Sequence, residues 1–182
     1  LKDGDIKSYA DLKGKKIAVG PSGSVAGDAM KTIMDAYGYE INKDWSPEYL
    51  SHGDGAEALT DGNVDAVCIM STFPASPVAT AAASKELRLL DLDQEQYDKI
   101  MEACPYYLPA TIEANVYNGQ DEPVERTFGS ASLMVSCRDL SDDDAYAIAK
   151  ALFENNDTLV AAYPQCDEWS LENATRGLDG QV

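Results

Sequence analysis

The feature that most constrains this chain is a short apolar stretch followed by a glycine- and serine-rich turn and a helical pattern. Residues 15–19 have the length and the apolar end of a buried parallel strand. Residues 20–23, Gly-Pro-Ser-Gly, break that strand, and Ser24 suits the N-cap of a helix that stops near Gly38. The apolar positions of this helix are Val25, Ala29, Ile33 and Ala36. The pattern predicts an α/β fold.

This first loop predicts an anion-binding site. A turn of this kind directs several backbone N–H groups and the positive end of a helix dipole at one place. The loop lacks the spacing of a P-loop and of a Gly-x-Gly-x-x-Gly motif. The alternative is an ordinary strand-to-helix connection. The candidate residues, which would donate backbone N–H and hydroxyl groups, are Ser22, Gly23, Ser24 and Val25.

The arrangement of strand, polar loop and helix occurs a second time. Residues 64–70 predict a near-continuous apolar strand, and residues 71–75 a loop. Ser76 is the expected N-cap of the next helix, with Pro77 as its first residue. Ligands of doubly wound sheets collect where such loops gather, so Thr72, Phe73 and Ser76 are further candidates. The alternative is again a simple connector.

Weaker patterns predict the remaining elements. They are a helical turn over 8–14, a strand at 49–50, a helix capped by Asp54 and broken at 61–63, a strand over 87–92, a helix over 94–102, an extended segment over 106–117, a turn over 118–123, a strand-rich segment over 124–137 with its core at 130–136, a helix capped by Ser141 and running to about 156, and a last helix over 170–175 that ends at Gly177.

Charge and hydropathy exclude several classes of partner. The formal net charge of −18 argues against nucleic acids and anionic membrane surfaces. No apolar run approaches the ~20 residues of a membrane span, so direct insertion is not expected. A small anionic ligand remains compatible with this charge, because surface charges are screened over roughly 8–10 Å while a helix N-terminus acts locally.

Chemistry-bearing residues are sparse. The cysteines at 68, 104, 137 and 166 form no Cys-x-x-Cys motif, and their three alternative pairings stay open. Cys68 lies in an apolar run and is expected to be a buried thiol. His52 is the only histidine, too few for a typical metal site. We therefore predict no metal and no cofactor, and the acidic residues 142–144 are expected to stabilise a helix dipole rather than to bind a metal.

An enzyme is the competing hypothesis. Ser51, His52 and Asp54 are close in sequence and suggest a hydrolase, but nucleophilic triads are assembled from separated segments. Cys68 with His52 is a second option, although a thiol in an apolar strand is usually inert. We predict no catalytic residues.

Four segments, taken in order, resemble the TAXI family of solute-binding receptors, which serve TRAP transporters. The segments are residues 8–24, residues 55–66 with their Asp-Gly-x-x-Asp-Ala ending, residues 111–120 ending in Val-Tyr-Asn-Gly-Gln, and residues 143–155. Two positions depart from the family pattern: Phe73 stands before Pro74 where glycine is usual, and Val25 stands where small residues or threonine are common.

The resemblance implies a type II periplasmic-binding-protein fold with a doubly wound lobe and part of a second lobe. Residues 1–124 would form the second lobe and residues 125–182 would return to the first, whose remaining upstream part we expect to be missing. Tyr117 would close the cleft. Residues 133, 135, 148, 152 and 153 would then be partly uncovered.

The implied function is capture of a small organic acid, of the glutamate or 2-oxoglutarate class, for the membrane subunits of a TRAP transporter. The implied location is periplasmic or extracellular, with a lipid anchor as one arrangement. A ligand-sensing module of a signalling protein is the alternative.

Overall fold

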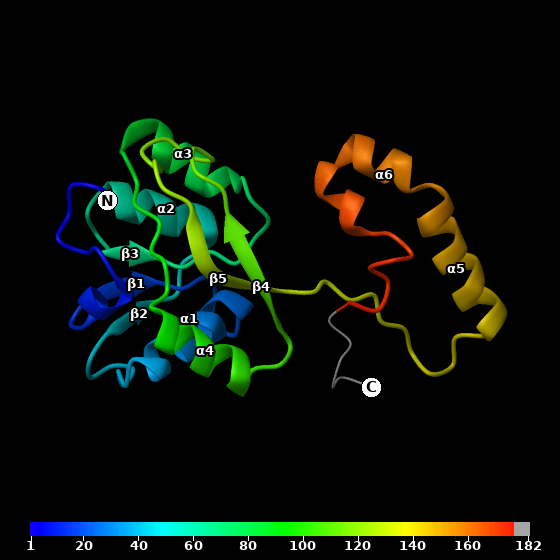
Figure 1. Cartoon of the computed structure of the whole chain (residues 1–182), viewed down its shortest axis with the longest axis horizontal. Helices are drawn as coiled ribbons and strands as arrows, with labels where there is room; N and C mark the ends of the chain where they lie inside the picture. Colours follow the sequence, from blue (N-terminus) through cyan, green and yellow to red (C-terminus); the bar gives the residue numbers. More distant parts are fainter. Residues whose placement is uncertain (177–182) are drawn as a thin grey trace. The chain divides into compact units, whose positions relative to one another are not determined.

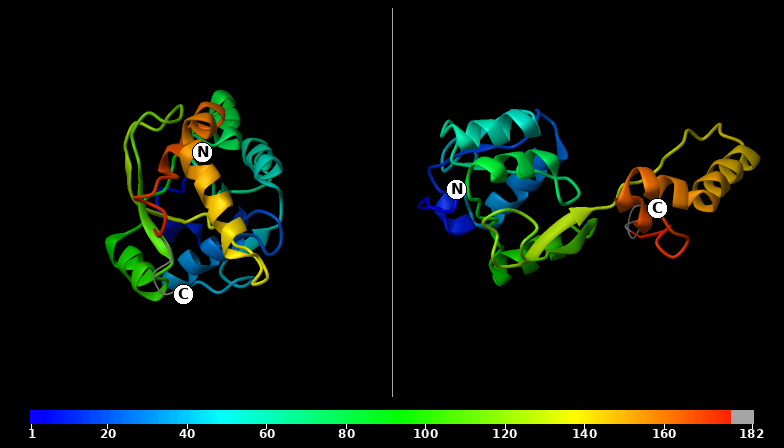
Figure 2. Two further views of the ribbon diagram at one scale, coloured as in Figure 1. Left: turned by 90° about the vertical axis from the view of Figure 1, so that its right-hand side faces the viewer. Right: turned by 90° about the horizontal axis from the view of Figure 1, so that it is seen from above.

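The computed structural model describes residues 1–176, which divide into two compact units (Figures 1 and 2). The first unit holds Leu1–Cys104 and Leu108–Gly129. The second holds Pro105–Tyr107 and the described residues from Ser130 on. Both binding loops predicted from the sequence belong to the first unit.

Helices and short strands alternate as far as α3, and a helix and two strands follow. They are η1 (Tyr9–Leu12), β1 (Lys16–Ala18), α1 (Val25–Ala36), β2 (Ser46–Glu48), α2 (His52–Thr60), β3 (Ala66–Val67), α3 (Ser76–Ser84), α4 (Gln94–Ala103), β4 (Tyr107–Ile112) and β5 (Val124–Ser130).

A three-stranded parallel sheet organises the first unit. Its strand order is β2-β1-β3, with Ile17 of β1 opposite Pro47 on one side and Ala66 on the other. The chain passes from β1 to β2 on one side and then from β2 to β3 on the other side of β1. These two crossovers run in opposite directions, and because both are right-handed, α1 and α2 lie on opposite faces of the sheet. Helix α1 packs against α4 and helix α2 against α3 (Figure 1). The predicted α/β class with a parallel sheet is confirmed. Strands β4 and β5 pair in a separate two-stranded sheet.

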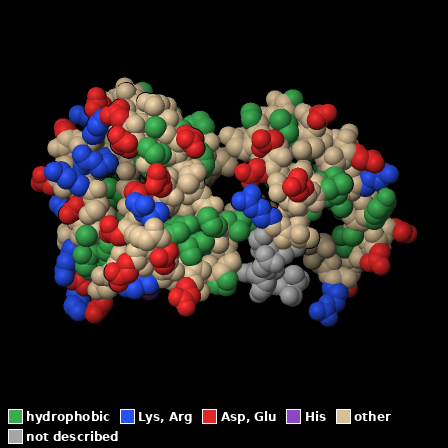
Figure 3. Space-filling model, viewed as in Figure 1, with side chains coloured by type: hydrophobic (Ala, Val, Ile, Leu, Met, Phe, Trp, Pro, Cys, Tyr) green, Lys and Arg blue, Asp and Glu red, His purple; other side chains and the backbone are tan. Residues whose placement is uncertain are grey.

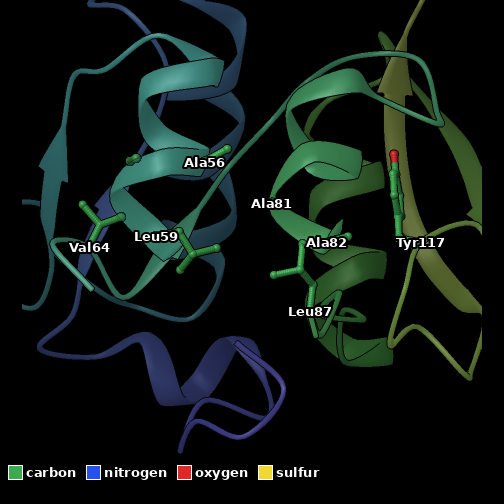
Figure 4. Packing of buried hydrophobic residues seen from close by; sticks show 8 residues of the cluster. Ala56, Leu59, Val64, Ala81, Ala82, Leu87 and Tyr117 are labelled. Atoms are coloured by element: carbon green, nitrogen blue, oxygen red, sulfur yellow. The ribbon is translucent and has the colours of Figure 1, made fainter. Parts of the chain in front are cut away.

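Small residues let α2 lie close to the sheet. A Cβ atom at Gly55 would meet the Cβ of Ala18 at 3.0 Å and the Cγ2 of Val67 at 3.2 Å. The core around this contact joins α2, α3 and the segment before β5 (Figure 4). Its buried members are Ala18, Ala56, Leu59, Val64, Ala81, Ala82, Leu87 and Tyr117.

Long-range contacts fix the first residues of the chain. The backbone N–H of Lys2 donates to the carbonyl of Glu86 (2.9 Å), and the Lys2 ammonium pairs with Asp121. The Arg88 guanidinium donates to the carbonyls of Ile6 and Lys2, both at 2.7 Å. Residues 1–6 are thereby tied to segments more than 80 positions away in sequence.

The second unit contains α5 (Asp142–Glu154), α6 (Asn156–Ala162) and η2 (Pro164–Glu168). Ser141 caps α5 as predicted, accepting the N–H of Asp144 at 3.1 Å. No residue of α5 is buried. Val135 is 84% exposed and Ile148 44% exposed, which confirms the expected uncovered apolar surface at these positions. Figure 3 shows hydrophobic side chains, in green, on the surface of this unit.

Two predicted helix caps are wrong by a few residues. Ser51 rather than Asp54 caps α2, because the Ser51 Oγ accepts the Asp54 N–H (3.2 Å). Ala75 rather than Ser76 is the N-cap of α3, so Ser76 is already helical. In both cases the helix begins earlier than the most polar residue suggests.

Five predicted segments differ from the observed strands and helices. Strand β2 lies at Ser46–Glu48 rather than at 49–50, and β3 covers only Ala66–Val67 of the predicted 64–70. Residues 87–92 and 131–137 form no strand. Residues 170–175 form hydrogen-bonded turns rather than a helix, and the predicted stop at Gly177 lies outside the described residues.

Candidate functional site

The two predicted loops leave adjacent parallel strands at the same edge of the sheet. The first follows β1 and leads into α1, and the second follows β3 and leads into α3. The N–H of Cys68 donates to the carbonyl of Ala18 (2.8 Å), and the Cys68 thiol donates to the carbonyl of Ala26 (3.4 Å). Because β2 and β3 flank β1 on opposite sides, the strand order reverses here, where open α/β sheets bind ligands.

The first loop is held in shape by Ser24. Its Oγ accepts the N–H of Gly27 (3.3 Å) and donates to the carbonyl of Val19 (3.1 Å), as the cap of α1. A Cβ atom at Gly20, whose φ is +79°, would lie 2.7 Å from that oxygen. The Ser24 hydroxyl proton is therefore already used. The N–H groups of Val25 and Ala26, at the first turn of α1, have no acceptor within the helix.

A small pocket of about 120 Å³ lies beside the first loop. Three of the predicted residues line it: Ser22, Gly23 and Ser24. Lys31, which pairs with Asp35, and Trp45, whose buried indole N–H has no hydrogen-bond partner, also line it. Val25 is 55% exposed and lies outside the lining.

The second loop borders a larger pocket of about 230 Å³. Of the predicted residues, Thr72, Phe73 and Tyr117 line it, and Ser76 does not. The peptide bond between Phe73 and Pro74 is cis. The eight predicted residues are thus distributed over two separate pockets, with Val25 and Ser76 in neither.

The Tyr117 ring is buried, and its hydroxyl accepts the N–H of Ala75 at 2.7 Å. The ring therefore supports the start of α3 (Figure 4). Gln120, only 5% exposed, satisfies four backbone groups around the same turn. Its Oε1 accepts from Val116 (3.1 Å) and Tyr117 (3.3 Å), and its Nε2 donates to Glu113 (2.8 Å) and Glu122 (3.1 Å).

Among the residues that line the larger pocket, Tyr9 and Arg88 are two polar ones that were not predicted as site residues. Tyr9 comes from η1, and burial, with a smaller contribution from Cys68, raises the pKa of its hydroxyl. Arg88 follows the core residue Leu87. Neither carries a local sequence signal, because both reach the pocket through tertiary contacts. Cys68 lines the pocket too, and burial raises the pKa of its thiol to about 12.

The residues of the enzyme hypothesis take part in a helix cap. The Ser51 hydroxyl donates to the Asp54 carboxylate (2.7 Å), and His52 is the first residue of α2. Over residues 1–176, no three His, Cys, Asp or Glu side chains gather as metal ligands would. All four cysteines are free thiols.

Comparison with known families agrees with a binding protein. The sequence model of the NMT1-like family matches residues 1–179, nearly the whole chain. This family is periplasmic-binding-protein-like and generally non-enzymatic. In the described part of the chain, no helix combines the length and the apolar character needed to cross a bilayer.

Proposed function

Because the chain belongs to the NMT1-like family, which indicates solute binding at the family level, we propose that it captures a small organic acid outside the cytoplasm. The captured acid would be delivered to the membrane subunits of a TRAP-type transporter. No catalytic step is part of this function.

The observation that carries the proposal is the pair of loops at the reversal of strand order between β1 and β3. Each loop ends at the N-terminus of a helix of more than eight residues. Backbone N–H groups and the positive helix ends suit a carboxylate, even on a chain with a net charge of −18. The first loop supplies Ser22 and Gly23 beside the N–H groups of Val25 and Ala26, which have no acceptor within α1.

The finer parts of the proposal rest on the four segments that resemble the TAXI receptors. They support glutamate and 2-oxoglutarate as the first acids to test and a TRAP transporter as the partner. They also support a periplasmic or extracellular location.

The test is the Gly23→Val variant. Gly23 has φ +74° and open space where a Cβ would stand, so valine places methyl groups where an anion approaches the backbone. We expect affinity for the bound acid, measured by calorimetry, to fall by about tenfold or more, which corresponds to ~1.4 kcal/mol or more.

Gly38→Val is the matched control. Gly38 also has φ +74° and open space, but it follows the carboxyl end of α1. Both variants carry the same backbone strain, so a loss confined to Gly23→Val assigns the effect to the loop. Equal affinities in the two variants would show that the first loop is only a turn. Failure of the unmodified protein to bind any organic acid would refute the proposed function itself.

A further inference from the structure

We propose that the larger pocket is the place of a further β-strand of the three-stranded sheet, and that this strand is the segment joined directly to the amino side of Leu1. The strand completes the sheet beside β3. It lies outside the proposed acid site at the first loop, which belongs to the smaller pocket.

The larger pocket lies in the plane of the sheet, on the free side of β3. Strand β3 pairs with β1 on its other side. Helices α1 and α2 cover opposite faces of the sheet, and both contribute to the pocket wall. Met30 and Ile33 come from α1, and Ala56 and Leu59 come from α2. A space beside a strand that touches the helices of both layers is where a neighbouring strand of an α/β sheet lies.

Two segments border this space, and they do not pair with each other. They are residues 66–70, which contain β3, and residues 87–90. Within the described chain, the N–H groups of residues 69–70 and 89–91 donate to no other backbone group. These residues are half-buried, where an unpaired backbone group is unfavourable. A strand placed between the two segments would offer backbone partners to both of them.

The space is large and its wall is mainly apolar. Its volume is about 230 Å³, whereas protein interiors leave few voids larger than a water molecule. Half-buried aliphatic side chains line it, among them Ile69 and Leu89. The Arg88 guanidinium is already used in two hydrogen bonds to backbone carbonyls. Because a strand between two helix layers is apolar on both faces, this wall suits such a strand.

The first residues of the chain enter at one end of this space. Leu1 lines the pocket, and Lys2, which does not line it, lies beside the second bordering segment. The N–H of Lys2 donates to the Glu86 carbonyl (2.9 Å), and the Lys2 carbonyl accepts from Arg88 (2.7 Å). A segment joined to Leu1 therefore continues along residues 87–90 in the opposite direction, as an antiparallel strand.

A strand of the same chain also has an advantage over a strand from a second copy. Its docking is intramolecular, so the effective concentration is high. The formal net charge of −18 adds repulsion between two copies. Both arguments select the segment joined to Leu1 as the occupant.

A matched pair of extended proteins tests this assignment. The extension Lys-Val-Ala-Val-Ala-Val-Thr is joined to Leu1 of the whole chain, and in the control protein proline replaces its middle valine. Proline lacks the N–H that a ladder needs and is excluded from the interior of a central strand. We expect the urea midpoint of unfolding to rise by about 0.5 M or more with the valine extension and to stay unchanged with the proline extension.

Hydrogen exchange locates the added strand. We expect peptides that cover residues 66–70 and 87–91 to exchange at least about tenfold more slowly with the valine extension than with the proline extension. Peptides of α5 are the internal control, because α5 belongs to the second unit, and they should exchange at equal rates in the two proteins.

Three results would overturn the inference. Equal exchange at both bordering segments in the two folded proteins would show that no strand enters beside Leu1. Association of the valine protein through its extension, with the bordering segments exchanging as in the control, would also refute it. Slower exchange there in the unextended chain as its concentration rises would assign the space to a second copy. Organic acid binding at the first loop is measured separately, so the proposed function stands or fails independently.

Discussion

Ser24 shows how one residue of the predicted site serves both the fold and the ligand. Its side chain was predicted to cap α1 and also to donate to an anion. The observed hydroxyl accepts from Gly27 and donates to Val19, which leaves ligand contact to the backbone around it. The cap could be predicted because Ser24 precedes a clear helical period. The second hydrogen bond could not, since it depends on how the chain turns at Gly20.

The Ser24→Ala variant should therefore lose stability through the cap. We expect the free energy of unfolding in urea to fall by about 0.5–2 kcal/mol. Ser22→Ala, at an exposed position of the same loop, should change it by no more than about 0.5 kcal/mol. Equal effects in the two variants would contradict the role of the cap.

Cys68 is a half-buried residue whose thiol is shielded from water, whereas Cys104 is the buried cysteine. The pKa of the Cys68 thiol is raised to about 12, so it stays protonated in the folded protein at pH 8. We expect iodoacetamide to label exposed Cys137 well before Cys68, as mass spectrometry of peptides would show. Labelling of both at the same rate in the folded protein would contradict this assignment.

The same pKa shift predicts a loss of stability in alkali. The unfolded thiol ionises near pH ~8.5, whereas the folded thiol ionises near pH 12, so the folded state binds more protons between these values. The contribution of the buried thiol to the free energy of unfolding is therefore complete below the pKa of the unfolded thiol and declines as pH rises towards 12. Unfolding free energy should fall less steeply over this range in Cys68→Ala than in the unmodified protein. If the unfolding free energies of the two proteins fell in parallel with pH, the raised pKa of Cys68 would be contradicted.

At the scale of elements, strong local patterns predicted the structure and tertiary pairing decided the rest. Strand β1, helix α1 with its cap, α4 and the cap of α5 agree with the sequence, because periodicity and caps are local signals. Residues 87–92 are apolar like a strand, yet their partners are scattered. Arg88 binds residues near the N-terminus, and the N–H of Leu92 donates to Arg126 (3.1 Å). Neither of these pairings leaves a pattern in the sequence that would predict it.

Strand lengths also depend on neighbours. β2 contains Pro47, which is tolerated because β2 pairs only with β1 and is therefore an edge strand. β1 ends at Ala18, before the turn at Gly20, which shortens the ladder that β3 can form. Of the candidate site, the two loops were predictable from local patterns. The separation of their residues into two pockets was not, because it follows from packing.

The start of α3 depends on a side chain from a distant turn. In Tyr117→Phe, the N–H of Ala75 loses its acceptor in a buried place. We expect the free energy of unfolding to fall by about 1–3 kcal/mol. Tyr146→Phe, on the exposed side of α5, is the control and should be nearly neutral. An unchanged free energy of unfolding in Tyr117→Phe would mean that water reaches the Ala75 N–H.

At the scale of the whole molecule, uncovered apolar side chains on the second unit predict self-association. Leu133, Val135 and Ile148 are all at least 44% exposed, and α5 buries none of its residues. We expect light scattering to show an average mass that rises with protein concentration. Ile148→Glu should reduce that rise, and Lys150→Gln should not. A constant monomer mass over the concentration range would contradict the prediction.

The ties between residues 1–6 and the segments around Glu86, Arg88 and Asp121 bear on how the chain folds as it is synthesised. A ribosome releases residues 1–6 well before these partners, which lie more than 80 positions later in the chain. A nascent chain that has formed β1, α1, β2 and α2 would still hold residues 1–6 without their partners. Docking them closes a loop of about 80 residues, whose entropic cost grows only slowly with length. Residues 1–6 are therefore made before β1 but reach their final place only after the segments around Glu86 and Arg88 have been synthesised.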